Sequence, residues 1–354
     1  SITAYDIDAK TIEKLTSGLV KGKLAIHGIL AIDSPGHAAF TNLRKRGGSL
    51  ADIAVLVIDI NEGFKPQTYE ALEILKQYKT PFVIALNKID LISGWRGKDK
   101  VLIKNINLQS EQTKKFLDEK LYNIVGKLYE LGFNSERFDK VEDYTKQIAL
   151  IPVSAKTGEG IPELLVILAG LSQKFLEKNL QVNTEIPGKG TILEVKNIKG
   201  IGKCLQVILY DGKIKENDKI VIGGLNGAIE TKIRSVSVLK NNKFEKSNSV
   251  SASAAIQINS PGLDDVYAGM PIRVANDDLE ELKKEVQREV EEILIETDKS
   301  GIVVRADSLG SLEGLINLLK ENGIKIKKAS IGEITKDDLI KAENDEDELN
   351  QVVL

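Results

Sequence analysis

The sequence is short of several residue types that mark whole classes of protein. Its 354 residues include one cysteine, Cys204, and two histidines, His27 and His37. A single cysteine excludes an internal disulfide framework and agrees with a reducing compartment. No apolar run approaches the roughly 20 residues that a membrane-spanning helix needs, and no secretory signal opens the chain. We therefore expect a cytoplasmic protein without membrane contacts.

Charge of one sign is not in excess either. The formal net charge is −3, with 29% charged and 42% hydrophobic residues, which is ordinary for a soluble globular protein. This balance neither indicates nor excludes RNA, because a local basic patch is enough to bind phosphate. The length allows two or three domains. Because the first residue is Ser1 rather than Met, we interpret the start as processed, truncated or incomplete.

Residues 28–180 alternate continuous apolar runs with amphipathic stretches. The runs cover residues 28–33, 53–60, 81–90 and 148–154. The amphipathic stretches cover residues 67–78, 111–131 and 161–180. Continuous apolar runs are typical of strands buried on both faces of a parallel sheet. The alternation predicts a doubly wound, mostly parallel α/β domain over residues 1–180, in which residues 93–110, with the only tryptophan, Trp95, form an insertion.

The pattern changes after about residue 181. Short β-rich runs cut by Gly, Asn and Asp turns predict a small β-barrel over residues 181–276, with a polar loop at 241–249. A charged helix over 278–295 then opens a third segment, residues 277–354. Its predicted strand, helix, strand and helix cover residues 301–307, 308–322, 325–330 and 335–343. We interpret it as a partial α/β domain, since such sheets usually have more than two strands.

Three polar motifs lie where predicted strands of the first domain end. They are Asp33-Ser34-Pro35-Gly36-His37, Asn87-Lys88-Ile89-Asp90 and Ser154-Ala155-Lys156. Ligands of open parallel sheets bind beyond the carboxyl ends of the strands. We therefore expect all three motifs to converge on one nucleotide site.

Two of the motifs have the chemistry to recognise guanine. The Asp90 carboxylate can accept hydrogen bonds from the ring N–H and the exocyclic amine of guanine, a pair of donors that adenine does not have. The Lys88 stem would lie along the base plane, and the Asn87 amide would tie neighbouring loops together. Backbone N–H groups around Ala155 would meet the guanine carbonyl oxygen.

The first motif fits the phosphate end of the same ligand. Asp33 would reach Mg²⁺ through a water, because magnesium keeps several of its waters. Gly36 has no Cβ, so its N–H can approach a γ-phosphate closely. His37 would lie beside the attacking water, in the water-positioning role of such hydrolases. An Asp-x-x-Gly alone is more often a turn; the ordered set of three motifs is what favours a guanine nucleotide.

Other features have plainer interpretations. The basic run Arg44–Arg46 is either an RNA contact or a solvated helix face. Glycines 200, 202 and 212 lie within β-rich sequence and indicate tight turns. We assign no function to His27 and interpret Trp95 as a packing residue.

Several longer stretches can be matched as they stand. They are DSPGHAAFTNLRKRGGSLADIAVLVIDINEGFKPQT, NKIDLISGW, IPVSAKTGEGIPELL, KGTILEVK, YDGKIKENDKI, SPGLDDVYAGMPIRV and GIVVRADSLGSLE. They resemble translation initiation factor 5B of archaea and eukaryotes, the counterpart of bacterial initiation factor 2, over nearly the whole chain. The resemblance implies a translational GTPase that uses GTP, GDP and Mg²⁺ and promotes the joining of ribosomal subunits.

The resemblance also implies a role for each matching residue. The matches are the catalytic histidine (His37), the second switch (Asp33, Gly36), the guanine-specificity motif (Asn87, Lys88, Asp90), the second base-contacting loop (Ser154, Ala155, Lys156) and a first-switch threonine that binds Mg²⁺ (Thr3).

The chain also departs from the family pattern. It contains no G-x-x-x-x-G-K-[ST], the loop that holds the β- and γ-phosphates; in the family this loop and its strand precede the position of Ser1. The family's long connecting helix and final tRNA-binding barrel are also absent, and Ser34 replaces a usual Thr. We therefore expect a chain truncated at both ends, without its N-terminal central strand, that alone binds GTP poorly and hydrolyses it barely.

Two hypotheses remain open. In the first, the chain is a GTPase initiation factor, as a fragment or one half of a split protein. It would contact ribosomal RNA and protein and other initiation factors, and initiator tRNA only if the C-terminal domain were supplied. In the second, it is a non-catalytic ribosome-binding fragment or paralogue that has lost hydrolysis. Asp33, His37 and the intact Asn87–Asp90 motif favour the first, and LRKRGG and INEGFKPQT speak against a different translational GTPase.

Overall fold

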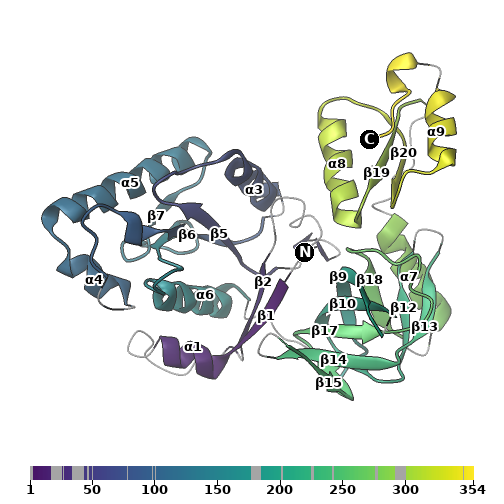
Figure 1. Cartoon of the computed structure of the whole chain (residues 1–354), viewed down its shortest axis with the longest axis horizontal. Helices are drawn as coiled ribbons and strands as arrows, with labels where there is room; N and C mark the ends of the chain where they lie inside the picture. The colour runs from purple at the N-terminus through teal and green to yellow at the C-terminus, as the bar shows by residue number, and fades with distance from the viewer. Residues whose placement is uncertain are drawn as a thin grey trace. The chain divides into compact units, whose positions relative to one another are not determined.

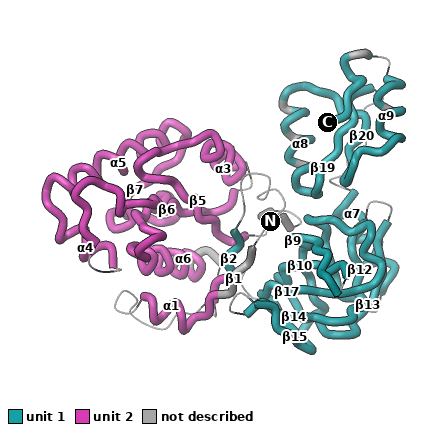
Figure 2. Tube along the Cα trace, viewed as in Figure 1, with its two compact units in different colours: residues 1–6, 30–50, 182–354 teal, residues 7–29, 51–181 magenta. Residues whose placement is uncertain are grey.

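The computed structural model falls into two compact units. The residues it describes are 3–16, 26, 28–33, 44–45, 48–49, 51–77, 79–97, 99, 101–176, 185–200, 202–224, 227–240, 243–275, 278–291, 300–345 and 347–354. One unit comprises residues 7–29 and 51–181, and the other comprises residues 1–6, 30–50 and 182–354 (Figure 2).

The first of these units is built on a parallel sheet. Its strands are β5 (Ala54–Asp59), β6 (Phe82–Asn87), β8 (Ile148–Pro152) and β7 (Ser135–Arg137), hydrogen-bonded in that spatial order. The helices are α3 (Pro66–Gln77), α4 (Leu102–Leu108), α5 (Glu111–Glu130) and α6 (Ile161–Leu176), with the short turn η1 at Ile89–Leu91. Figure 1 shows α3 and α5 on one face of the sheet and α6 on the other. The predicted doubly wound α/β domain is confirmed.

Strand β6 explains why the sequence runs here are continuously apolar. Ile84 and Leu86 point into the core formed with α3 and α5. Val83 and Ala85 point into the core formed with α6. Because successive side chains of a strand alternate between faces, a strand covered on both sides needs an apolar residue at every position.

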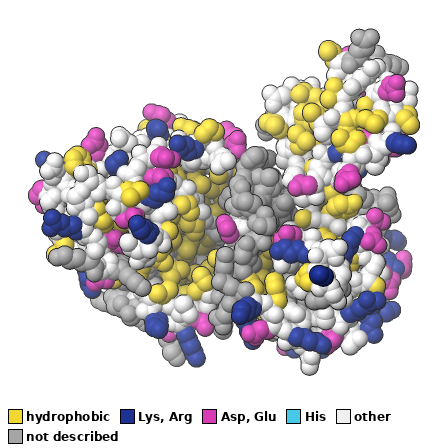
Figure 3. All heavy atoms as spheres, viewed as in Figure 1, with side chains coloured by type: hydrophobic (Ala, Val, Ile, Leu, Met, Phe, Trp, Pro, Cys, Tyr) yellow, Lys and Arg dark blue, Asp and Glu magenta, His cyan; other side chains and the backbone are white. Residues whose placement is uncertain are grey.

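The two edges of this sheet differ. At the β5 edge Val57 is 59% exposed, and Figure 3 shows apolar side chains gathered over α6 and this edge.

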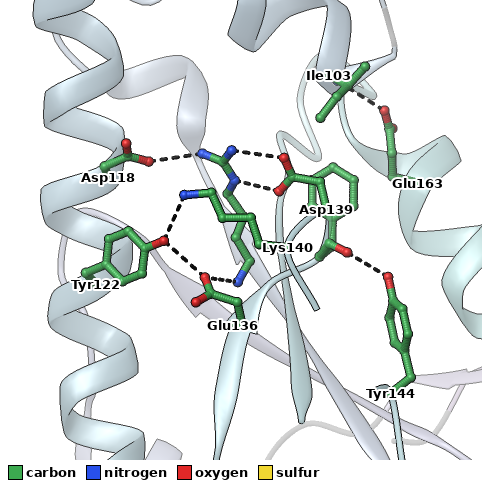
Figure 4. A network of polar contacts seen from close by, with 10 residues as sticks. Ile103, Asp118, Tyr122, Glu136, Asp139, Lys140, Tyr144 and Glu163 are labelled. Atoms are coloured by element: carbon green, nitrogen blue, oxygen red, sulfur yellow. Dashed lines mark hydrogen bonds and ion pairs between the residues drawn. The ribbon is translucent and has the colours of Figure 1, made fainter. Parts of the chain in front are cut away.

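The β7 edge, which the sequence analysis missed, is tied to α5 by polar contacts. The Arg137 guanidinium donates to Asp118 on α5 at 3.0 Å and to both oxygens of Asp139 at 2.6 and 2.9 Å (Figure 4). A strand of three residues is therefore enough here, because the side-chain bonds of Arg137 hold it in place in addition to its short backbone pairing with β8.

The sequence analysis predicts that the run Gly28–Asp33 belongs to the parallel sheet, but in the structure it does not. It forms β2, which pairs with β1 (Thr3–Asp8) in a separate two-stranded sheet; α1 (Ala9–Leu15) follows β1. Its residues from Ile29 to Ile32 are only half-buried, whereas β6 between two helical layers is almost fully buried. The apolar run correctly indicated a strand, but such a run does not say which strand lies beside it.

The second unit contains an antiparallel sheet wrapped around an apolar core. The strands are β9 (Lys189–Ile198), β10 (Gly202–Asp211), β12 (Lys219–Ile222), β13 (Ile229–Lys232), β14 (Ser235–Lys240), β15 (Lys243–Ser247), β17 (Ala254–Asn259) and β18 (Pro271–Val274). They are ordered β13-β12-β18-β9-β10-β17-β14-β15. Two short pairs accompany them: β11 (Lys213–Lys215) with β16 (Ser249–Ser251), and β3 (Arg44–Lys45) with β4 (Gly48–Ser49). The predicted barrel-like architecture is present. Of the basic run, Arg44 and Lys45 lie in strand β3 rather than on a helix, and Arg46 lies outside the described residues.

The C-terminal part of this unit follows the predicted order. Helix α7 (Leu279–Glu291) is followed by β19 (Ile302–Ala306), α8 (Leu309–Glu321), β20 (Ile326–Ile331), α9 (Lys336–Glu343) and η2 (Glu348–Asn350). Strands β19 and β20 are parallel. One apolar cluster contains barrel residues together with Val290 of α7 and residues of β19, α8 and β20. The domain boundaries at residues 180 and 276 stay predictions.

Two buried ionic clusters stabilise this unit. Arg273 of β18 donates to both carboxylate oxygens of Glu289 on α7 at 2.8 and 2.9 Å. The Asp338 carboxylate of α9 is fully buried. It forms ion pairs with the Arg305 guanidinium of β19 at 2.6 Å and with the Lys328 ammonium of β20 at 2.8 Å. Burial alone raises the pKa of the Asp338 carboxyl, but the hydrogen bonds from these cations and from Thr335 outweigh it and leave that pKa well below its usual value. Both helices are therefore attached to their strands by charge, and α7 also by apolar packing through Val290.

Candidate functional site

The carboxyl edge of the parallel sheet brings two of the predicted motifs together. Asp59 at the end of β5 is paired in register with Asn87 at the end of β6. Leu86 is paired in turn with Pro152 of β8, so the Ser154 loop begins beside the residues that follow Asn87. In a parallel sheet these ends share one edge.

Asn87 connects the two motifs. Its side-chain oxygen accepts the backbone N–H of Ala155 at 3.0 Å and that of Lys88 at 2.8 Å. The Asn87 amide therefore ties neighbouring loops, as expected. The Ala155 N–H, expected to face the guanine carbonyl, is bonded to Asn87, so that role stays a prediction for the amides around it.

Asp90 and Ser154 form a second link. The Ser154 hydroxyl donates to Asp90 Oδ1 at 2.7 Å and accepts the Thr157 N–H at 3.2 Å. Asp90 is half-buried, whereas Ile89 beside it is fully buried and its N–H donates to the Val153 carbonyl. The carboxylate is thus held through one of its oxygens, Oδ1.

Lys88 takes an unusual backbone conformation that aims its side chain along the edge. Its φ of 69° lies in the left-handed region, which non-glycine residues seldom adopt. The ammonium lies 2.7 Å from Asp59, and the Lys88 carbonyl accepts the Asn61 side chain at 3.1 Å. Hydrogen bonding to Asp59 raises the pKa of Lys88. Burial raises the pKa of Asp59, but the bonds from Lys88 and from the Asn61 amide more than offset this and lower it.

The Ser154 loop closes on itself through Glu159 and Gly160. The Ser154 N–H donates to the Glu159 carbonyl at 2.9 Å. Gly160 has a φ of 78°, and a Cβ there would overlap the Pro152 carbonyl oxygen. The loop therefore needs glycine at this position for both conformation and space.

The expected phosphate end is only partly described. Asp33 is an exposed residue at the end of β2, and Thr3 opens β1. Ser34, Pro35, Gly36 and His37 lie outside the described residues, as does His27. Within the part of the chain that the structure describes, no group of three or more His, Cys, Asp or Glu side chains could hold a metal ion. The convergence of all three motifs therefore stays a prediction, while the second and third are in contact.

Three residues at this edge escaped the sequence analysis. Asp59 forms an ion pair with Lys88, and the Asn61 side chain donates a hydrogen bond to the Lys88 carbonyl. The buried Glu159 carboxylate accepts a hydrogen bond from the indole N–H of Trp95. For Asp59 a signal existed, because it is a carboxylate at the end of the apolar run 53–60. For Glu159 there was none, because its partner lies 64 residues away in the chain.

Comparison with known proteins gives a consistent answer. Residues 8–174 match the GTP-binding domain of elongation factor Tu, and residues 275–352 match translation-initiation factor 2. A probable translation initiation factor IF-2 from Ignicoccus hospitalis is 49% identical over 97% of this chain. Another from Archaeoglobus fulgidus is 46% identical over the whole chain. The chain belongs to the translation initiation factor IF-2 family.

Similarity in structure agrees with this assignment to the IF-2 family. The crystal structure of GDP-bound aIF5B from Aeropyrum pernix superposes with a TM-score of 0.91, at 44% identity over 99% of this chain. This chain spans 58% and 61% of the two relatives and 61% of the crystallised protein. No helix in the described ranges is long and apolar enough to cross a bilayer.

Proposed function

We propose that the sheet edge formed by Asn87–Asp90 and Ser154–Lys156 binds the base of a guanine nucleotide. The observation that supports this most is the Asp90 carboxylate, held by the Ser154 hydroxyl with one oxygen still available. The ring N–H and exocyclic amine of guanine supply two donors to such a group, and leaving a half-buried carboxylate unpaired against adenine is costly. Lys88, fixed by Asp59, would border the base with its aliphatic stem.

We also propose that the chain is the GTP-hydrolysing part of an initiation factor acting on the ribosome. GTP would be hydrolysed to GDP and phosphate, with His37 positioning the water. Asp33 fits a water-mediated Mg²⁺ contact, since it is a single exposed carboxylate at a strand end and magnesium is commonly held by one or two carboxylates with phosphates. When bound, Mg²⁺ would neutralise charge on the β- and γ-phosphates. Ribosomal subunits and other initiation factors would be its partners.

The base site is tested by exchanging its specificity. In Asp90→Asn the side-chain amide can accept the ring N–H and donate to the 2-oxygen of xanthine, but it meets the guanine amine with a second donor. We expect wild type to prefer GDP over XDP and the variant to reverse that preference, by at least about tenfold in each direction. Competition against a fluorescent nucleotide measures both.

The control is Asp118→Asn, the same chemical change on α5 of the same unit. It should leave the preference for GDP unchanged. A wild-type chain that binds GDP and ADP equally would refute guanine recognition. Because the phosphate-loop motif is not in these 354 residues, we expect weak affinity overall, and submicromolar binding of a GTP analogue would refute that expectation.

Hydrolysis separates the two functional hypotheses. A GTPase initiation factor should release phosphate from GTP faster when ribosomes are added, and His37→Ala should abolish that increase. Ribosome binding without any such increase would favour the non-catalytic module instead.

A further inference from the structure

A buried carboxylate connects the Ser154 loop to a segment not assigned to any site. Glu159 is 1% exposed. Both of its oxygens lie 3.2 Å from the indole Nε1 of Trp95, and Oε1 also accepts the side-chain amide of Asn105. Burial raises the pKa of Glu159, and these two hydrogen bonds oppose that rise. Among the described residues, both side chains that donate to this carboxylate come from one segment.

That segment, here named the clamp segment, comprises residues 93–97, 99 and 101–109. It is rigid through its own hydrogen bonds. Gln109 accepts the Arg96 N–H at 2.9 Å and donates to the Arg96 carbonyl at 2.8 Å. Asn105 likewise exchanges hydrogen bonds with the backbone of Asp99, at 2.6 and 3.1 Å. A preformed module of this kind can hold another loop in place.

The clamp segment is attached at a second point as well. Glu163, on the first turn of α6, accepts the N–H of Leu102 at 2.6 Å and of Ile103 at 3.3 Å (Figure 4). Leu102 and Ile106 are buried in the core that α5 and β6 share. The segment is therefore fixed to the body of the unit at a second point.

We propose that Trp95 and Asn105 are positioning residues for guanine recognition, which they serve by holding Glu159. This inference rests on the proposed base site. The Glu159 carbonyl receives the Ser154 N–H, and the Ser154 hydroxyl holds Asp90. A shift of Glu159 thus passes through two hydrogen bonds to the carboxylate that would read the base. No contact of the clamp segment with a phosphate is involved.

The test measures base discrimination separately from nucleotide binding. Affinities for GDP, for IDP, which lacks the exocyclic amine, and for ADP are obtained by competition against a fluorescent GDP analogue. Trp95→Phe keeps a packed ring and removes the N–H donor, and Glu159→Gln removes the charge and turns one acceptor into a donor. We expect each variant to lower the GDP-to-IDP affinity ratio about fivefold or more, with ADP affinity unchanged.

A matched control distinguishes positioning from general loss of stability. Asp118→Asn weakens an ion pair with Arg137 in the same unit and should lower the melting temperature without changing the GDP-to-IDP ratio. Variants that melt earlier but keep the wild-type ratio would overturn the proposal. A wild-type chain with no preference for GDP over ADP would overturn the proposed base site and this inference together.

A second measurement needs no variant. Trp95 is the only tryptophan of the chain, so intrinsic emission reports on the indole that donates to Glu159. Saturating GDP should change the emission, and ADP at the same occupancy should not. Emission indifferent to bound GDP would mean that the base and the clamp segment do not communicate, which contradicts the proposal.

Discussion

The ion pair between Arg273 and Glu289 gives the sharpest test of how α7 is held. Both side chains are almost completely buried, at 6% and 9% exposure, and Nη2 of Arg273 donates to both carboxylate oxygens of Glu289. Glu289→Ala would remove the carboxylate from a buried guanidinium that keeps the carbonyls of Gly190 and Ile272 and the side chain of Tyr210, whose ring lies 5.7 Å away. Removing one partner of a buried pair costs about 3 kcal/mol or more.

Hydrogen exchange measures this cost locally. If α7 exchanges by local opening, about 3 kcal/mol corresponds to roughly 150-fold faster exchange of the peptide over residues 279–291. The matched control is Glu280→Ala on the same helix, where the removed carboxylate is 77% exposed and the cost should stay below about 0.5 kcal/mol.

An apolar replacement completes this test. Arg273→Met combined with Glu289→Leu removes both charges from the buried site, so protection should return to within about 1 kcal/mol of wild type. Exchange in Glu289→Ala no faster than in Glu280→Ala would refute the reasoning, because it would mean that the buried charge finds water or new partners at no cost.

Three other perturbations have equally definite outcomes. Asp338→Ala should lower the unfolding free energy of its unit by about 3 kcal/mol, because it leaves Arg305 uncompensated. Because folding lowers the pKa of Asp338, its carboxylate contributes fully to the free energy of unfolding above its unfolded pKa, near 4. The difference in unfolding free energy between wild type and Asp338→Ala, measured by urea titration, should therefore shrink as the pH falls below that value. Burial raises the pKa of Glu163, so the ionised carboxylate is disfavoured in the folded state and stability falls as the pH rises through that pKa. Glu163→Gln should therefore raise the melting temperature relative to wild type at pH 7 but not at pH 4. Gly160→Ala should cost about 2 kcal/mol or more by calorimetry, through a strained φ and overlap with Pro152; an unchanged transition would mean that the loop rearranges freely.

Much of the α/β unit could be predicted because its local signals agree with its tertiary structure. The apolar run 81–90 contains β6, where burial on both faces leaves no polar position, and the apolar run 53–60 contains β5, although Val57 of that strand is exposed. The Asn87 and Ser154 motifs could be placed beside each other by the general behaviour of parallel strands. Contacts such as Asn87 with Ala155 then follow from two strand ends at one edge.

The parts that escaped prediction depend on neighbours that sequence does not specify. Strand β15 occupies Lys243–Ser247 in a stretch expected to be a loop, because an edge strand can be charged and mostly exposed. Strand β7 is three residues long and relies on Arg137. The sequence analysis did not single out Glu159 and interpreted Trp95 as a packing residue, because the contact between the two forms only when the whole unit is folded.

The side chains of β6 alternate strictly between the two faces of the sheet, so the register of this strand determines the packing on both sides. Inserting or deleting one residue between Phe82 and Leu86 would exchange the two layers, sending Ile84 and Leu86 toward the side now filled by Val83 and Ala85. The same slip would turn Asn87 away from the Ala155 amide. The packing of the two layers and the position of Asn87 thus depend on the same residue register along β6. Substitutions that change side-chain volume along this strand should therefore be tolerated far more easily than changes in its length.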